Sequence, residues 1–457
     1  MRRAWWLAPL ITSVVLLTLP SPAYANTRVR VAAQPRRSAV TTWAARYDGA
    51  NLEDVAYAIK TSPDGTRVFV TGEGALPDHS RDYTTIAYDA ATGTQLWLTR
   101  YDGNGCDYDE AYAMAVSPDG SALFVTGSSC GAYATVAYDA ATGTQLWVAR
   151  VEESIASAIT VSPDGRKVYV TGYDVARWHT VAYDAATGRL IWLSQYVGHG
   201  LEANIAESIG VSQDGRSLFV TGWNYTGNSD DYATVAYNAT TGSELWVAEY
   251  NDPSNGYDEA YSVGVAPDGS RVYVTGQSGA GGYDDYATVA YDARSGDQLW
   301  VATYDGPSGR IDEARSLGVS PDGTRIYVTG QSNGQGSSAD YATIAYDSAS
   351  GTQLWVARYD GPESGMDDAF ALGVDPGGSL VYVTGRSTGI ATHFDYATVA
   401  YDATTGDQVW ESRYDGPANR DDFALALAVG SNGSVFITGE SKGHGKHFDY
   451  ATVGMFP

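Results

Sequence analysis

Aspartate is the residue that recurs most regularly at positions where a side chain could do chemistry. A first set stands just before a small-apolar segment, once per repeat, and comprises Asp54, Asp109, Asp258, Asp312, Asp367 and Asp422. Two repeats carry Ser154 and Asn204 there instead. A second set precedes a tyrosine-containing apolar segment and comprises Asp82, Asp231, Asp285, Asp340, Asp395 and Asp449, with Ala132 and Arg177 in the other repeats.

These carboxylates allow two interpretations. Aspartate accepts hydrogen bonds from the backbone N–H groups of nearby loops, and repetition once per repeat favours this structural role. Several carboxylates gathered at one place would also suit a hard cation such as calcium, which prefers oxygen ligands. The chain has neither an EF-hand nor a glycine-rich calcium repeat. The identity of any metal therefore stays open.

Histidines form a second candidate group, because four of the six fall in three repeats that are neighbours if the chain closes into a ring. His79, His393 and His447 each precede an aspartate of the second set by two or three positions, and His444 lies nearby. A mixture of imidazole and carboxylate suits metal binding or proton transfer. Exposed loop histidines without a role are the competing interpretation.

Two tryptophans depart from the repeat. Of the 12 tryptophans, eight recur once per repeat and two lie near the N-terminus, which leaves Trp178 and Trp223. We expect both at the surface, where an aromatic ring stacks on a sugar or contacts a partner protein. The alternative is that they fill space where the third repeat is short.

The elements that must position these residues are strands. A Val-Tyr-Val-Thr-Gly phrase recurs 45 to 55 residues apart, with its glycine at 72, 127, 172, 222, 276, 330, 385 and 439. Each repeat holds four strand-like segments separated by Gly, Pro, Asp or Asn, which is the pattern of a propeller blade. The chain starts with a lone fourth strand at 41–46 and ends with a unit of only three strands. The sequence therefore predicts an all-β, eight-bladed propeller over 41–457, whose N-terminal strand completes the last blade and removes two sheet edges.

The strand order also separates two faces of this propeller. Short Ser-Pro-Asp-Gly and Asp-Ala-Ala-Thr-Gly turns join strands one to two and three to four, and they change little between copies. The connections from strand two to three and from four to one vary, and we call the face that carries them the variable-loop face. Variable loops on a rigid scaffold are the usual place for binding.

The N-terminus and the composition indicate export. Residues 1–25 read as a signal peptide, with two arginines, an apolar core and an Ala-Tyr-Ala cleavage site. Residues 26–40 read as a flexible lead-in, and no membrane span is expected after cleavage. Cys106 and Cys130 are the only cysteines, and an even count in an oxidising compartment favours a disulfide. A net charge of −26 excludes nucleic acid and anionic membranes as partners.

The repeats also resemble known propeller families. The phrases Asp-Tyr-Ala-Thr-Val-Ala-Tyr-Asp-Ala and Leu-Trp-Val-Ala-Arg-Tyr-Asp-Gly look like the secreted bacterial SBBP propeller repeat, and Ser-Pro-Asp-Gly followed by Val-Tyr-Val-Thr resembles the YVTN repeat. The segment Ala87 to Trp97 is similar to the tryptophan-docking pattern of quinoprotein propellers. That resemblance implies eight blades locked together by tryptophans. The adjacent cysteine pair of many quinone-dependent dehydrogenases is missing, so we do not expect the cofactor PQQ.

These features predict a secreted, monomeric scaffold that binds an extracellular protein or glycan through the variable-loop face, without catalysis and without a cofactor. The alternative is an enzyme with its site at the channel mouth, either a glycan lyase or hydrolase or a PQQ-type dehydrogenase. The two hypotheses differ in what they expect at that mouth. An enzyme gathers unlike residues with perturbed pKa values there, whereas a scaffold shows only equivalent aspartates that fix loops.

Overall fold

The computed structural model describes residues 40–456 except 104, 199–203, 228, 280–282, 337, 391–392 and 446. The chain divides into residues 1–36 and a compact unit of residues 37–457, and the second unit holds everything described below. The expected signal peptide and all of the lead-in before residue 40 lie outside the described residues. No helix in the described part of the chain is long and apolar enough to span a lipid bilayer.

All regular elements of the described ranges are β-strands, grouped in fours. Blades one to four comprise β2 (Val55–Thr61), β3 (Arg67–Ala75), β4 (Arg81–Asp89), β5 (Gln95–Tyr101); β6 (Asp109–Val116), β7 (Ala122–Ser129), β8 (Ala132–Asp139), β9 (Gln145–Glu152); β10 (Ile155–Val161), β11 (Lys167–Tyr173), β12 (Trp178–Asp184), β13 (Leu190–Tyr196); and β14 (Asn204–Val211), β15 (Ser217–Tyr225), β16 (Asp230–Asn238), β17 (Glu244–Tyr250). Blades five to eight comprise β18 (Tyr257–Val265), β19 (Arg271–Gly279), β20 (Asp284–Asp292), β21 (Gln298–Tyr304); β22 (Asp312–Val319), β23 (Arg325–Asn333), β24 (Ala339–Asp347), β25 (Gln353–Tyr359); β26 (Asp367–Val374), β27 (Leu380–Thr388), β28 (Phe394–Asp402), β29 (Gln408–Tyr414); and β30 (Asp422–Val429), β31 (Val435–Lys442), β32 (Phe448–Phe456) with β1 (Val40–Tyr47).

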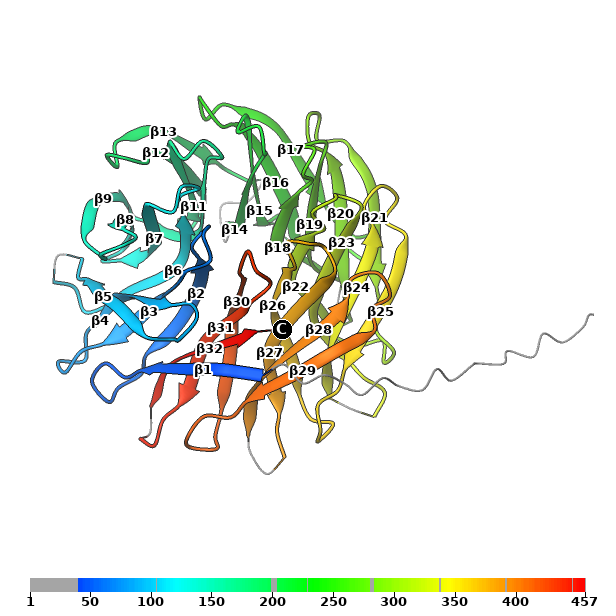
Figure 1. Ribbon diagram of the computed structural model, residues 1–457. Coiled ribbons are helices and arrows are strands. Elements are labelled where there is room, and N and C mark those ends of the chain that lie inside the picture. The colour runs from blue at the N-terminus through cyan, green and yellow to red at the C-terminus, as the bar shows by residue number, and fades with distance from the viewer. Residues whose placement is uncertain are drawn as a thin grey trace, which may run out of the picture. The chain divides into compact units, whose positions relative to one another are not determined.

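Each blade is an antiparallel sheet, and the eighth is closed as predicted. β1 pairs with β32 from Val40 opposite Phe456 to Tyr47 opposite Tyr450. A single parallel bridge between Asp230 and Tyr257 joins blades four and five, so strand pairing alone defines seven sheets. Inner strands contact one another in the order β2, β6, β10, β14, β18, β22, β26 and β30, and β30 contacts β2 again. Figure 1 shows this ring, with blue β1 beside red β32.

Recurring turns end the strands. In the first blade Asp89 accepts a hydrogen bond from the Thr92 backbone N–H at 2.9 Å, and Gly93 follows with a φ of 70°. A Cβ atom at Gly93 would lie 2.5 Å from the Trp43 ring of the preceding blade. Glycine is therefore required twice here, for its left-handed conformation and for its close contact with the neighbouring tryptophan.

Tryptophans lock each blade to the next, as the quinoprotein resemblance implies. The Trp43 indole Nε1 donates to the Ala90 carbonyl at 2.9 Å, and the tryptophans from Trp97 to Trp355 each donate the equivalent bond to a carbonyl of the next blade. Trp410 is buried but its Nε1 has no acceptor among the described residues. Blade eight has no turn between its third and fourth strands, because β32 and β1 come from opposite ends of the chain.

Candidate functional site

The first set of aspartates fixes the loops of the variable-loop face. All six are fully buried at the start of an inner strand. Asp54 accepts hydrogen bonds from the backbone N–H groups of Gly49 and Ala75, both at 2.7 Å, and thereby joins the connection before β2 to the end of β3. The five others each accept a backbone N–H bond from the preceding connection, at 2.6–3.0 Å. This geometry provides the structural role that repetition favours.

The structure brings both aspartate sets together with a third that sequence reasoning missed. At five junctions, the aspartate that begins a third strand, the one in the Tyr-Asp-Gly segment after the fourth strand, and the one that begins the next blade lie close together. Their nearest carboxylate oxygens lie within 4.8 Å of one another. The five triads are Asp48, Asp54 and Asp449; Asp82, Asp102 and Asp109; Asp285, Asp305 and Asp312; Asp340, Asp360 and Asp367; and Asp395, Asp415 and Asp422.

An arginine of the fourth strand balances some of these triads. Arg358 donates to Asp340 at 2.8 Å, to the Ser332 carbonyl at 2.7 Å and, across the blade boundary, to the Tyr304 hydroxyl at 3.0 Å. Arg46 and Arg413 make the same set of bonds at their own junctions. We call these residues the clamp arginines. Each one offsets part of the negative charge of its triad and joins two blades.

Burial and mutual repulsion perturb the triad carboxylates. Burial raises the pKa of Asp54 to about 6, and the nearby carboxylates of Asp48 and Asp449 contribute to the rise. The pKa of Asp285 also rises to about 6, through burial and then the carboxylates of Asp305 and Asp312. Both effects penalise the charged form, so ionisation near neutral pH stores repulsion at the junctions.

A different group of unlike residues lies at the variable-loop end of the inner strands in blades one and two. Glu73 is buried, forms an ion pair with Arg81 at 2.5 Å and contacts the Glu110 carboxyl group. The Tyr112 hydroxyl donates to Glu110, and the Tyr112 ring packs on Tyr57. Burial raises the pKa of Glu73 to about 7, and Glu110 adds to the rise although Arg81 opposes it. We call these five residues the mouth group.

In blades seven and eight, cationic side chains and aromatic rings lie together on the variable-loop face. Arg386 donates through Nε to Asp368 at 2.6 Å and lies 4.8 Å from the centroid of the Phe394 ring and 5.3 Å from that of Phe423. Lys442 lies 3.9 Å from the centroid of the Phe448 ring. In these blades, cationic side chains therefore lie against aromatic rings.

Of the four predicted histidines, the structure brings His79 and His447 to one pocket and His444 and His447 to another. His79 and His447 both line a pocket of about 250 Å³ at the boundary of blades one and eight, together with Glu53 and Arg81. His393 is separate, 70% exposed, and 3.6 Å from Asp421. No grouping of three or more metal-ligating side chains in the described residues includes a histidine.

The prediction that Trp178 lies at the surface is wrong, and the alternative that it fills space inside the short third repeat is confirmed. Its side chain is 0% exposed and packs on Tyr196 with ring centroids 5.0 Å apart. Trp178 begins β12 and pairs with Tyr196, as Tyr83 pairs with Tyr101 in the first blade. It therefore replaces the buried tyrosine of the repeat, and aligning the two segments would have shown this. Trp223 is partly buried in β15, one position after the repeat glycine, where Glu73 stands in blade one.

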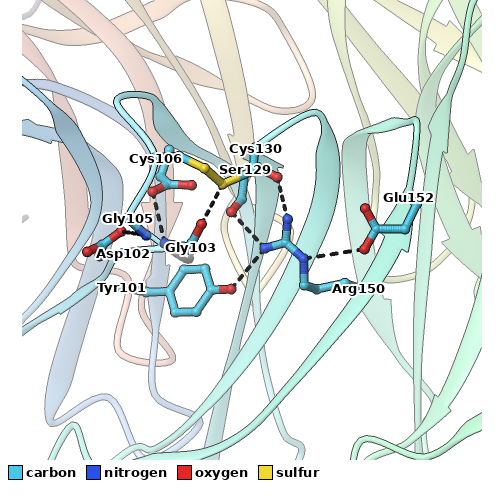
Figure 2. Close-up of a disulfide and its surroundings, with 10 residues drawn as sticks. Tyr101, Asp102, Gly103, Gly105, Cys106, Ser129, Cys130, Arg150 and Glu152 are labelled. Carbon is cyan, nitrogen blue, oxygen red and sulfur yellow. Dashed lines mark hydrogen bonds and ion pairs between the residues drawn. A yellow bond between two sulfur atoms is a disulfide. The ribbon is translucent and has the colours of Figure 1, made fainter.

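Cys106 and Cys130 form the predicted disulfide, shown in Figure 2. Their Cα atoms are 5.7 Å apart, and the bond links the connection before β6 to the turn after β7. Beside it, Arg150 donates to the Ser129 carbonyl at 2.7 Å and to the Tyr101 hydroxyl at 3.1 Å. Arg150 therefore makes the same bonds to the serine carbonyl and to the tyrosine of the preceding blade as the clamp arginines do. It has no aspartate partner at the start of the third strand, because Ala132 stands there.

Comparison with known proteins identifies the family. The family model described as outer membrane protein assembly factor BamB, a PQQ-like repeat model, matches residues 28–170, 81–315 and 231–452. The chain belongs to the PQQ-like, BamB-type β-propeller repeat family. No curated protein matches the chain.

Solved structures support the fold alone. Sqt1 from Chaetomium thermophilum is 15% identical, with a TM-score of 0.63 over 92% of this chain and 98% of that one. The C-terminal WD40 domain of Sif2 is 12% identical, with a TM-score of 0.61 over 92% of this chain and 99% of that one. Similarity at this level shows a propeller and carries no function.

Proposed function

We propose that the protein is a secreted, monomeric scaffold that binds an extracellular protein or glycan through its variable-loop face and catalyses no reaction. The SBBP-like and YVTN-like phrases of its repeats support export. The matching family model is named for an assembly factor, which is also a non-enzymatic role.

The observation that carries this proposal is the distribution of large exposed apolar side chains. Some of these side chains lie along the fourth strands, at the outer edge of the blades. All the others within the described residues lie on the variable-loop face: Tyr108, Ile155, Val175, Val197, Tyr257, Tyr283, Ile311, Met366 and Ile390. The turns of the opposite face expose none among the described residues. Apolar and aromatic side chains held in water on one face are typical of a recognition surface.

The mouth group is the specific observation that favours an enzyme, because its unlike residues include a carboxyl group with a pKa near neutrality. Its geometry does not suit glycoside hydrolysis. Glu73 and Glu110 are in hydrogen-bond contact, whereas the two carboxyl groups of a hydrolase stand about 5 Å apart or more. A lyase, which needs only proton transfer, is the enzymatic alternative that remains.

The mouth does not suit a quinone cofactor either. PQQ carries three carboxylates and requires cations that are free to meet them. Arg81, Arg315 and Arg386 are each already paired with an acidic side chain at the mouth, and Lys442 lies over the Phe448 ring, so that at most one cation of this group is left for three carboxylates. We therefore expect no PQQ in the native protein.

The test is a binding screen of the intact protein against immobilised glycans and extracellular proteins. Replacing Tyr108, Tyr257 and Tyr283 together by serine should reduce the binding found at least tenfold. In the matched control, serine replaces Leu146, Leu245 and Leu299 on the outer strands, and this variant should bind as the wild type does. Turnover of any bound glycan, or binding that survives the triple tyrosine substitution, would overturn the proposal.

A further inference from the structure

The face opposite the variable-loop face carries the short turns of the repeat, and we call it the short-turn face. In five blades the proline of the Ser-Pro-Asp-Gly turn, or of its variant, packs against the turn glycine of the next blade. A Cβ atom on that glycine would lie 3.2–3.5 Å from the proline ring at Gly120, Gly165, Gly215, Gly323 and Gly378. Gln213 replaces this proline in blade four, and a Cβ atom on Gly269 of blade five would meet nothing within 4 Å. One contact between neighbouring turns is therefore missing at the junction of blades four and five.

A second departure from the repeat lies at the same junction. The turn between the third and fourth strands has Ala or Thr at its third position in six blades, and it has Arg294 there in blade five. Gln213 and Arg294 both line a cavity of about 540 Å³. Gln213 and Asp214 also line a second cavity of about 350 Å³ between blades three and four. Each cavity falls in the range of about 300–1,000 Å³ that is usual for small-ligand sites, and the two share part of their walls.

The cavity walls offer both hydrogen-bond donors and acceptors to a ligand. Among the described residues, the side chains of Gln213 and Arg294 donate no hydrogen bond, so the amide and the guanidinium group are available. Asp268 uses its Oδ1 within its own turn, where it accepts the Ser270 backbone N–H at 2.9 Å. Its Oδ2 accepts no hydrogen bond from the described part of the chain. A ligand that both donates and accepts hydrogen bonds therefore matches these walls.

The charges of the two cavities decide between classes of ligand. Their walls hold the carboxylates of Asp164, Asp214 and Asp268 and the cations of Lys167 and Arg294. Hydrogen bonds from serine side chains in the turns lower the pKa of all three aspartates, which are therefore ionised at neutral pH. Three negative and two positive charges leave a net charge of −1. This mixture opposes a strongly charged ligand of either sign, whereas a hydroxyl group donates to a carboxylate and accepts from an amide or a guanidinium group.

We propose that these two cavities bind a short neutral oligosaccharide. Gln213 and Arg294 donate hydrogen bonds to its hydroxyl groups, and the Asp268 carboxylate accepts from them. Leu245 and Pro267, which also line the larger cavity, provide apolar surface for the C–H groups of a sugar ring. The site lies on the short-turn face and does not depend on the binding function proposed for the variable-loop face.

Calorimetric titration of the intact protein with neutral trisaccharides of glucose, mannose, galactose and N-acetylglucosamine tests the site, with trigalacturonate as the anionic comparison. We expect at least one neutral trisaccharide to bind, and trigalacturonate to bind more weakly than it does. Gln213→Pro and Arg294→Ala each restore the residue that the repeat has at this position in other blades, so the risk to folding is small. Each should weaken binding about tenfold or more, because it removes a hydrogen-bond donor to the ligand.

The matched control is Thr404→Ala, which changes the exposed residue of blade seven that corresponds to Arg294 and should leave trisaccharide binding unchanged. Serine at Tyr108, Tyr257 and Tyr283 should also leave it unchanged. Repeating the screen of the variable-loop face with Gln213→Pro protein separates the two sites, so that one proposal can fail without the other. The oligosaccharide site is overturned if no neutral trisaccharide binds, if trigalacturonate binds as tightly as the best neutral one, or if Gln213→Pro and Arg294→Ala both bind as the wild type does.

Discussion

Glu207 is the side chain for which the structure predicts an unusual dependence of stability on pH. It lies in inner strand β14, and burial raises its pKa from 4.5 to about 7, with a further contribution from the carboxylate of Glu259. Below pH 4.5 the side chain is protonated in both the folded and the unfolded state. As the pH rises from 4.5 to 7 the unfolded state loses its proton first, so the free energy of unfolding falls. Above pH 7 the full penalty is present.

The magnitude follows from the pKa values. The difference between about 7 and 4.5 corresponds to about 3.4 kcal/mol at 1.36 kcal/mol per pKa unit. Glu207 keeps some contact with solvent, which screens the interaction, so we expect about 2 kcal/mol. Glu207→Gln removes the charge at nearly constant size. It should raise the free energy of unfolding by about 2 kcal/mol at pH 8 and leave it nearly unchanged at pH 4.

Urea denaturation of the wild type and the variant at pH 4, 6 and 8 measures this difference. Glu244→Gln is the matched control, because Glu244 is exposed at the start of outer strand β17. That variant should show no change in stability at any of the three values. An equal effect of Glu207→Gln at pH 4 and pH 8, or destabilisation at pH 8, would refute the assignment of the penalty to the buried charge.

Three further predictions concern the buried tryptophans and the disulfide. Of Trp355 and Trp410, only Trp355 donates an indole hydrogen bond. Trp355→Phe should therefore lower the free energy of unfolding by about 1 kcal/mol more than Trp410→Phe does, as measured by urea denaturation. Equal losses in the two variants would contradict this. The disulfide closes a loop of 24 residues, so replacing both cysteines by serine should lower the free energy of unfolding by about 3 kcal/mol. Wild-type protein with its disulfide reduced is the comparison. Trp178→Ala should cost about 3–5 kcal/mol, as for other large core side chains, and a cost below 1 kcal/mol would contradict its burial.

The fold could be predicted because its evidence is periodic. Eight glycines, eight tryptophans and a divided last blade are local features of the sequence, and each maps to one strand or turn. The prediction for Trp178 was wrong because the residue was compared with tryptophans elsewhere and not with the residues at its own register. At the start of β12 it pairs with Tyr196, where the equivalent tyrosine of the first blade pairs with Tyr101.

The triads could be predicted only in part. Their members come from three segments, and two of those segments are separated from the third by a blade boundary. The aspartates of the first and second sets were visible as repeats, but the Tyr-Asp-Gly aspartates were not considered as site residues. The mouth group was missed for a related reason. Glu73 and Glu110 follow conserved-looking repeat positions, and their proximity arises only when β3 and β6 meet at the junction of blades one and two.

Comparison of equivalent positions separates the residues that hold the ring together from those that give it individual character. The repeat tryptophans and the turn glycines keep the same type, and they contact each other across the blade boundaries. The position after the repeat glycine changes from Glu73 to Trp223, Arg386 and Glu440, although the strand pairing around it stays the same. Chemical differences at the channel mouth therefore arise without loss of the fold, and ligand recognition is most readily encoded there.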